Sequence, residues 1–64
     1  MYILEKYTRE GQGYHVMLLA TAREVNQLKA YVDGNLNWTY TSDHSYVSEE
    51  LNDVYYKISK TKIV

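Results

Sequence analysis

The N-terminal third of the chain has the pattern of two strands joined by a tight reversal. Ile, Leu and Tyr dominate residues 2–9, and residues 14–20 are apolar at both sets of alternate positions. Gly11-Gln12-Gly13 between them supplies the backbone freedom that a turn needs. Because residues 14–20 are apolar on both faces, we expect them to form a central strand that is covered on both sides.

A helix is predicted next, over residues 21–33. Thr21 is the expected N-cap, and Glu24 three residues later completes the pattern of a capping box. Gly34 is the residue type that most often ends a helix in the left-handed conformation. Apolar residues recur at helical spacing, at Ala22, Val25, Leu28 and Val32. The pattern therefore predicts one amphipathic helix whose apolar stripe faces a sheet.

Shorter elements are predicted in the middle of the chain. Aromatic residues alternate with threonines over residues 37–41, which predicts a third strand. Ser42-Asp43-His44-Ser45 has the composition of a turn. Residues 46–51 fit either a strand or a short helix, and we favour a strand or an irregular segment for residues 46–49.

The end of the chain, residues 54–63, predicts a long strand because β-branched and aromatic residues dominate it. Alternation would place Val54, Tyr56 and Ile58 on one face, with Tyr55 and Lys57 on the other. The order of elements predicts a single α+β domain over residues 1–64. Its antiparallel sheet would hold three to four strands, with one helix packed on one face in a ββαββ order.

Composition narrows the class of protein. The 64 residues carry a net charge of −1, which argues against a general nucleic-acid binder, and 45% of them are apolar, which argues against disorder. The absence of Cys excludes disulfides and thiolate zinc sites, and two His are too few for a structural metal. Neither a signal peptide nor a membrane span is recognisable, so we expect a cytoplasmic protein.

Aromatic residues exceed what one small core needs. The chain has 8 Tyr and 1 Trp, and a single helix can cover only one face of a sheet. Tyr combines a large ring with a polar tip and suits an interface. We therefore expect a homodimer, formed through the open sheet face or a free sheet edge, although ordinary surface rings or a groove for another protein are alternatives. The expected dimer residues are Tyr14, Val54, Tyr55, Tyr56 and Ile58.

Charge is segregated along the chain. Residues 30–56 contain no Lys or Arg, and aromatic residues are interleaved with their acidic ones. Such a segment suits contact with a basic surface on another protein, although a solvated loop region would have the same composition. The expected partner-binding residues are Trp38, Tyr40, Asp43, Tyr46, Glu49, Glu50 and Asp53.

No residue set predicts catalysis, and we expect neither a metal nor a cofactor. Ser42-Asp43-His44-Ser45 contains the residue types of a hydrolytic triad, but contiguous residues do not normally converge as nucleophile, base and orienting group. His15 is expected on a strand surface. Gly11-Gln12-Gly13 precedes a strand rather than the helix that a phosphate loop requires. A small nucleotide stacked on Tyr or Trp in a dimer cleft, with Arg9 or Arg23 near its phosphates, is an alternative.

In size, order of elements and general residue pattern the chain resembles very small accessory proteins encoded by phages and mobile elements. The residues that carry the resemblance are Met1-Tyr2-Ile3-Leu4-Glu5-Lys6-Tyr7, residues 21–33 and Val54-Tyr55-Tyr56-Lys57-Ile58-Ser59-Lys60. The resemblance implies inhibition of a host defence protein, or of another host enzyme, by direct binding in the host cytoplasm. It transfers no functional residue. Our first hypothesis is thus a non-enzymatic, homodimeric inhibitor; the alternatives are a nucleotide sponge and a nucleic-acid-binding accessory domain.

Overall fold

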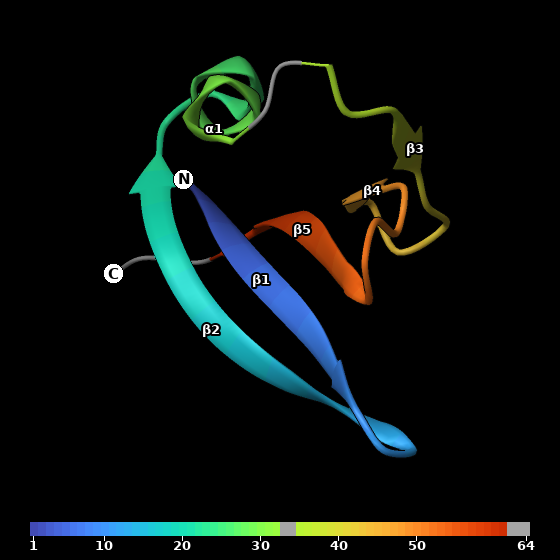
Figure 1. Ribbon diagram of the computed structural model, residues 1–64. Helices are drawn as coiled ribbons and strands as arrows, with labels where there is room; N and C mark the ends of the chain where they lie inside the picture. Colours follow the sequence, from blue (N-terminus) through green and yellow to red (C-terminus); the bar gives the residue numbers. More distant parts are fainter. Residues whose placement is uncertain (33–34, 62–64) are drawn as a thin grey trace.

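The computed structural model describes residues 1–32 and 35–61 as one antiparallel sheet with a short helix on one face (Figure 1). The strand order across the sheet is β2-β1-β5-β4-β3, so β1 and β5, from the two ends of the chain, lie side by side at its centre. The elements are β1 (Tyr2–Glu10), β2 (Gly13–Ala22), α1 (Val25–Tyr31), β3 (Trp38–Tyr40), β4 (Tyr46–Ser48) and β5 (Val54–Lys60).

The predicted α+β class and the single helix on one sheet face are confirmed, but the strand count is wrong. Within residues 1–32 and 35–61 the sheet has five strands rather than three to four, and the order is ββαβββ rather than ββαββ. The extra strand arises because the two short middle segments pair with each other as β3 and β4, and β4 then pairs with β5. Of the alternatives left open for residues 46–51, the structure has a strand over Tyr46–Ser48, β4, and the helical alternative is wrong.

The position expected for the second strand is also wrong. β2 lies at an edge of the sheet and pairs only with β1 among the described residues. Both faces of β2 do carry apolar residues, but the pattern of side chains reports the chemistry of the two faces and not the number of neighbouring strands. The register shifts between Leu4 and Glu5 of β1, which pair with Ala20 and Leu18, so Leu19 is an extra residue that forms a β-bulge.

The helix begins later than predicted because its expected first residues are paired in the sheet as part of β2. Thr21 and Ala22 pair with Ile3 and Tyr2 as the last residues of β2. Glu24 is the N-cap, and its backbone N–H donates a hydrogen bond of 3.3 Å to Oε1 of Gln27. The capping box is thus formed three residues further on than the sequence pattern indicated. The predicted stop at Gly34 lies outside the described residues.

The core lies between α1 and the centre of the sheet. Leu4 of β1, Leu28 of α1 and Ile58 of β5 are fully or almost fully buried, and Leu4 and Ile58 are paired across the two central strands. The partly buried residues around them are Tyr2, Leu19, Ala20, Ala22, Val25, Val32, Trp38, Tyr46 and Tyr56. The described residues include no helix long and apolar enough to cross a membrane.

Candidate interaction surfaces

The face of the sheet opposite α1 carries a cluster of three tyrosines. Tyr7 of β1 and Tyr55 of β5 are paired residues whose rings stack, with centroids 4.7 Å apart and an angle of 8° between the planes. Tyr14 of β2 meets both rings edge-on, at 6.3 Å from Tyr7 and 5.3 Å from Tyr55. Partial burial raises the pKa of the Tyr55 phenol, and the neighbouring Tyr7 adds to this effect.

Apolar residues of β2 extend this cluster toward the sheet edge. Val16 and Leu18 are opposite Tyr7 and Glu5 in the β1–β2 ladder and so share the tyrosine face, and they are 44% and 60% exposed. No helix or second sheet of the described chain covers this side, because the only described helix packs on the other face with Leu4 and Ile58. We call the side formed by Tyr7, Tyr14, Val16, Leu18 and Tyr55 the open face.

The structure separates the five predicted dimer residues into two groups. Tyr14 and Tyr55 lie on the open face. Val54, Tyr56 and Ile58 occupy the alternate positions of β5 and face the helix side, as the predicted alternation required. Ile58 is completely buried within the single chain, so its prediction as an interface residue is wrong: its side chain is already used in the core against Leu4 and Leu28.

Tyr7, Val16 and Leu18 were not predicted from the sequence as members of an exposed surface. Val16 and Leu18 were expected to be covered as part of a central strand, and of residues 14–20 only Tyr14 was expected at the dimer contact. The limit that one helix covers only one face of a sheet applies to this strand as well, and it indicates that one of its apolar faces stays exposed. The long uncharged stretch of β2 was the additional sign that this strand carries an apolar surface.

The acidic segment is largely paired with basic residues from other parts of the chain. Arg9 of β1 donates a hydrogen bond from Nη2 to Oε1 of Glu50 at 2.9 Å, and its Nε lies 3.6 Å from Oδ1 of Asp53. Lys57 Nζ lies 3.5 Å from Oδ2 of Asp43. The hydrogen bond to Glu50 is the main cause that raises the pKa of Arg9. Three of the predicted partner-binding carboxylates therefore already have cations beside them.

The remaining predicted partner-binding residues differ in accessibility. Glu49 is exposed and accepts a hydrogen bond of 3.1 Å from the amide of Asn37. Trp38 and Tyr46 pack against the core. Tyr40 is 57% exposed, and its hydroxyl is 2.9 Å from Nδ1 of His44. The structure does place most of these residues on one half of the sheet, around β3 and β4, but only some are free to meet a partner.

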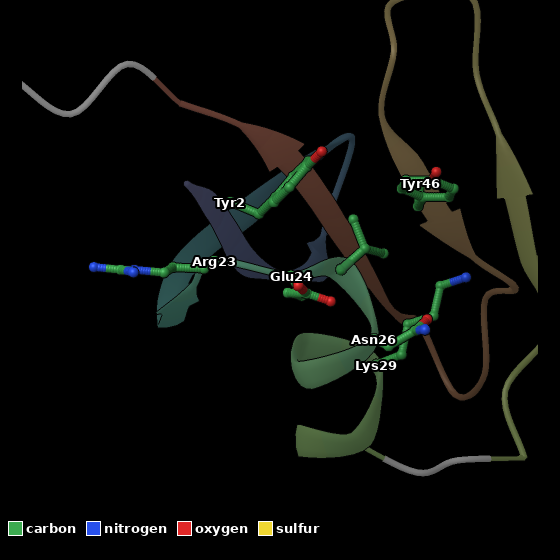
Figure 2. A pocket seen from close by; sticks show the side chains of 7 residues that line it. Tyr2, Arg23, Glu24, Asn26, Lys29 and Tyr46 are labelled. Carbon is green, nitrogen blue, oxygen red and sulfur yellow. The ribbon is translucent and has the colours of Figure 1, made fainter.

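A shallow groove lies beside the start of α1 (Figure 2). Tyr2 and Tyr46 line it from the sheet, and Lys29 contributes a cation that lies 4.7 Å from the centre of the Tyr46 ring. Arg23 is at its rim and reaches outward, away from Tyr46 (Figure 2). Aromatic rings and cations together can contact a planar anionic molecule. Arg9, the other cation considered for phosphates, is instead bound to Glu50.

The four residues that resemble a triad form the predicted turn. Thr41 and Ser45 close the β3–β4 hairpin through a backbone hydrogen bond of 2.8 Å, and His44 between them has a left-handed φ of 64°. The hydroxyl of Thr41 donates to Asp43, and this hydrogen bond is the main cause that lowers the pKa of the Asp43 carboxyl. Ser45 is buried. His15 lies exposed on β2, and no group of three metal-ligating side chains occurs among the described residues.

No protein-family model matches the chain, and no curated protein or solved structure is significantly similar to it. The surfaces described above are therefore the basis for a functional proposal.

Proposed function

We propose that this chain is a non-enzymatic binding protein that acts as a homodimer and inhibits a larger host protein by direct contact in the host cytoplasm. The observation that carries the proposal is the open face. A chain of 64 residues can bury little apolar surface, yet this one leaves Val16, Leu18 and Tyr14 of one strand exposed. Contiguous exposed apolar groups of this kind mark interaction sites.

The chemistry of the open face suits a protein partner. Its centre is the stack of Tyr7 and Tyr55, and tyrosine rings contribute large contact areas at a low cost in side-chain entropy. Charged residues, Arg9 and Lys57, lie at neighbouring positions and are occupied by carboxylates of the same chain. An apolar aromatic centre with a charged rim is the usual anatomy of a protein–protein interface. The resemblance to small phage proteins favours a host protein as the partner.

Affinity capture with matched variants tests this function. The wild-type chain, Tyr55→Lys on the open face and Asn26→Lys on the exposed side of α1 would each be immobilised and exposed to bacterial host lysate. Both substitutions add one positive charge, so N26K controls for the charge, whereas Y55K also removes the ring that stacks on Tyr7. We expect wild type and N26K to retain the same host protein, to bind it after purification and to inhibit its activity, whereas Y55K should not.

Folding of Y55K would be verified by circular dichroism before its binding is interpreted. Equal retention of the captured protein by Y55K and wild type would contradict a role for the open face. If the purified host protein keeps its full activity with excess wild-type chain bound, the inhibitor function is wrong.

A second candidate function is sequestration of a small nucleotide, which the groove between Tyr2, Tyr46 and Lys29 favours. A ligand that binds only the folded chain must raise its melting temperature. A panel of nucleoside phosphates would be compared for wild type and Lys29→Gln. A rise with wild type that is reduced in K29Q would support this candidate, and no rise with any nucleotide would reject it.

A further inference from the structure

We infer that the dimer forms through the edge of β2, which pairs antiparallel with β2 of a second copy so that Val16 lies on the twofold axis. The inference rests on the proposed homodimer and names its contact. It makes the sheet continuous across the two copies. In this arrangement the open faces remain uncovered and become one surface.

The first observation is that the outer edge of β2 is long and unpaired. β2 has ten residues and pairs only with β1 within the described parts of the chain, whereas the opposite edge strand, β3, has three residues. An edge strand presents backbone N–H and C=O groups that another strand can satisfy, and natural edge strands are often kept short for this reason. β2 therefore offers the larger template for strand addition.

The second observation concerns charge. Gly13–Ala22 contains no Lys, Arg, Asp, Glu or Pro, the residues that commonly protect edge strands from pairing. A twofold contact brings each residue close to its own copy or to near neighbours, so any charge would face a like charge. The uncharged β2 avoids that repulsion.

The regular part of β2 sets the register. It lies between Gly13 and the bulge at Leu19, so its five central residues run from Tyr14 to Leu18 with Val16 at their midpoint. Antiparallel pairing about Val16 places Tyr14 of one copy opposite Leu18 of the other on the open face. On the helix side it places His15 opposite Met17. Aromatic–aliphatic pairs of this kind stabilise neighbouring strands.

Exposure in the single chain agrees with this register. Tyr14, Val16, Met17 and Leu18 are between 42% and 60% exposed, although all four are large apolar or aromatic residues. Side chains on both faces of one strand are thus accessible at once, which is expected where a second strand is to be added alongside. A contact through the open face alone would leave Met17 exposed.

Cysteine cross-linking tests the contact directly, because the chain has no native Cys. Directly opposed residues in antiparallel strands have Cα atoms roughly 4.5–5.5 Å apart, within the range that a disulfide spans. We expect mild oxidation to convert Val16→Cys into a covalent dimer. Thr39→Cys on the opposite edge strand is the matched control and should stay monomeric on a denaturing gel.

Solution mass provides an independent measurement. Light scattering should give twice the 7.6 kDa chain mass for wild type. Val16→Lys sets two like charges on the axis at an exposed position, and we expect it to weaken dimerisation on the order of 100-fold or more without changing the circular dichroism spectrum. If the wild type is a dimer but V16C does not cross-link, or V16K stays dimeric, the edge contact is wrong and the homodimer stands. If the wild type is a monomer, both the edge contact and the homodimer are wrong. Host-protein capture tests inhibition separately in either case.

Discussion

Left-handed backbone at three residues other than glycine shapes the turns of the described chain. Asn52 and Asp53, with φ of 54° and 64°, form a two-residue hairpin closed by reciprocal hydrogen bonds between Leu51 and Val54. Asn and Asp tolerate this conformation, so that turn is well matched to its sequence. His44, with φ of 64°, is a bulkier residue at a position that favours Gly. Its ring nitrogen is held by the Tyr40 hydroxyl.

Two substitutions at His44 separate the backbone cost from the side-chain contact. His44→Gly and His44→Ala both remove the ring and its hydrogen bond to Tyr40, but only Gly adopts a positive φ without steric cost. We expect H44G to be more stable than H44A by about 1 kcal/mol, measured by urea denaturation. Equal stabilities would show that the backbone at residue 44 is not held in the left-handed region.

The stability that the Asp43 carboxyl contributes in the same turn depends on pH. Its pKa is lowered below 3.8 mainly by the hydrogen bond from Thr41, with Lys57 contributing. A lowered pKa in the folded state stabilises the fold at pH values above the unfolded pKa, and this contribution is lost as the pH falls through the folded pKa. We therefore expect the melting temperature of wild type to exceed that of Asp43→Asn near neutral pH.

The difference should shrink as the pH is lowered from 6 toward 2.5, because wild-type Asp43 becomes protonated while Asn does not titrate. Thermal melts of both proteins across this range measure it. If the melting temperatures of the two proteins differ by the same amount at every pH, a stabilising role for the ionised Asp43 is excluded.

Among the elements, the helix depends most on packing. α1 has seven residues, far fewer than the roughly 12–15 at which an isolated helix becomes marginally stable. Leu28 is its one buried residue and meets Leu4 and Ile58. Leu28→Ala should cost about 2–5 kcal/mol of unfolding free energy.

Asn26→Ala, at an exposed position of the same helix, is the control and should change stability by less than about 0.5 kcal/mol. Urea denaturation monitored by circular dichroism measures both variants. A loss in L28A no larger than that in N26A would mean that the helix is not held by this contact.

The helix and strands themselves were largely predictable from the sequence, whereas the order in which the strands pair in the sheet was not. Alternation in β5 correctly divided Tyr55 from Val54, Tyr56 and Ile58, because side chains of a strand alternate whatever lies beside it. The helix start was misplaced because pairing of Thr21 and Ala22 with β1 outweighs a local capping pattern. The edge position of β2 follows from the long-range pairing of β1 with β5, which no local pattern contains.

The candidate surfaces were predictable to a similar degree. The excess of tyrosine indicated an exposed aromatic surface, and Tyr14 and Tyr55 do lie on it. The acidic segment was visible as a run without Lys or Arg, but its pairing with Arg9 was not, since Glu50 is 41 residues away in the chain. Buried Ile58 could not be distinguished from exposed residues of β5 by alternation, because burial depends on which face receives α1.

At the level of the whole molecule, the described residues form two layers, one helix on one sheet, and none of them forms a third layer over the open face. Edge pairing through β2 would keep both helices on the same side, because a twofold axis perpendicular to the sheet preserves its faces. The tyrosine clusters of the two copies would then lie on one continuous surface. Self-association and host binding would use different parts of β2, its edge and its open face, and need not compete.

Stability should depend on protein concentration if the two copies fold and pair together, because binding between folded chains favours the folded state by mass action. We expect the melting temperature of wild type to rise over a hundredfold increase in concentration. Val16→Lys should have a melting temperature that is independent of concentration, and Asn26→Lys, with the same added charge on α1, should follow wild type. A constant wild-type melting temperature would indicate that the single chain is the stable unit and that the open face is available without a dimer.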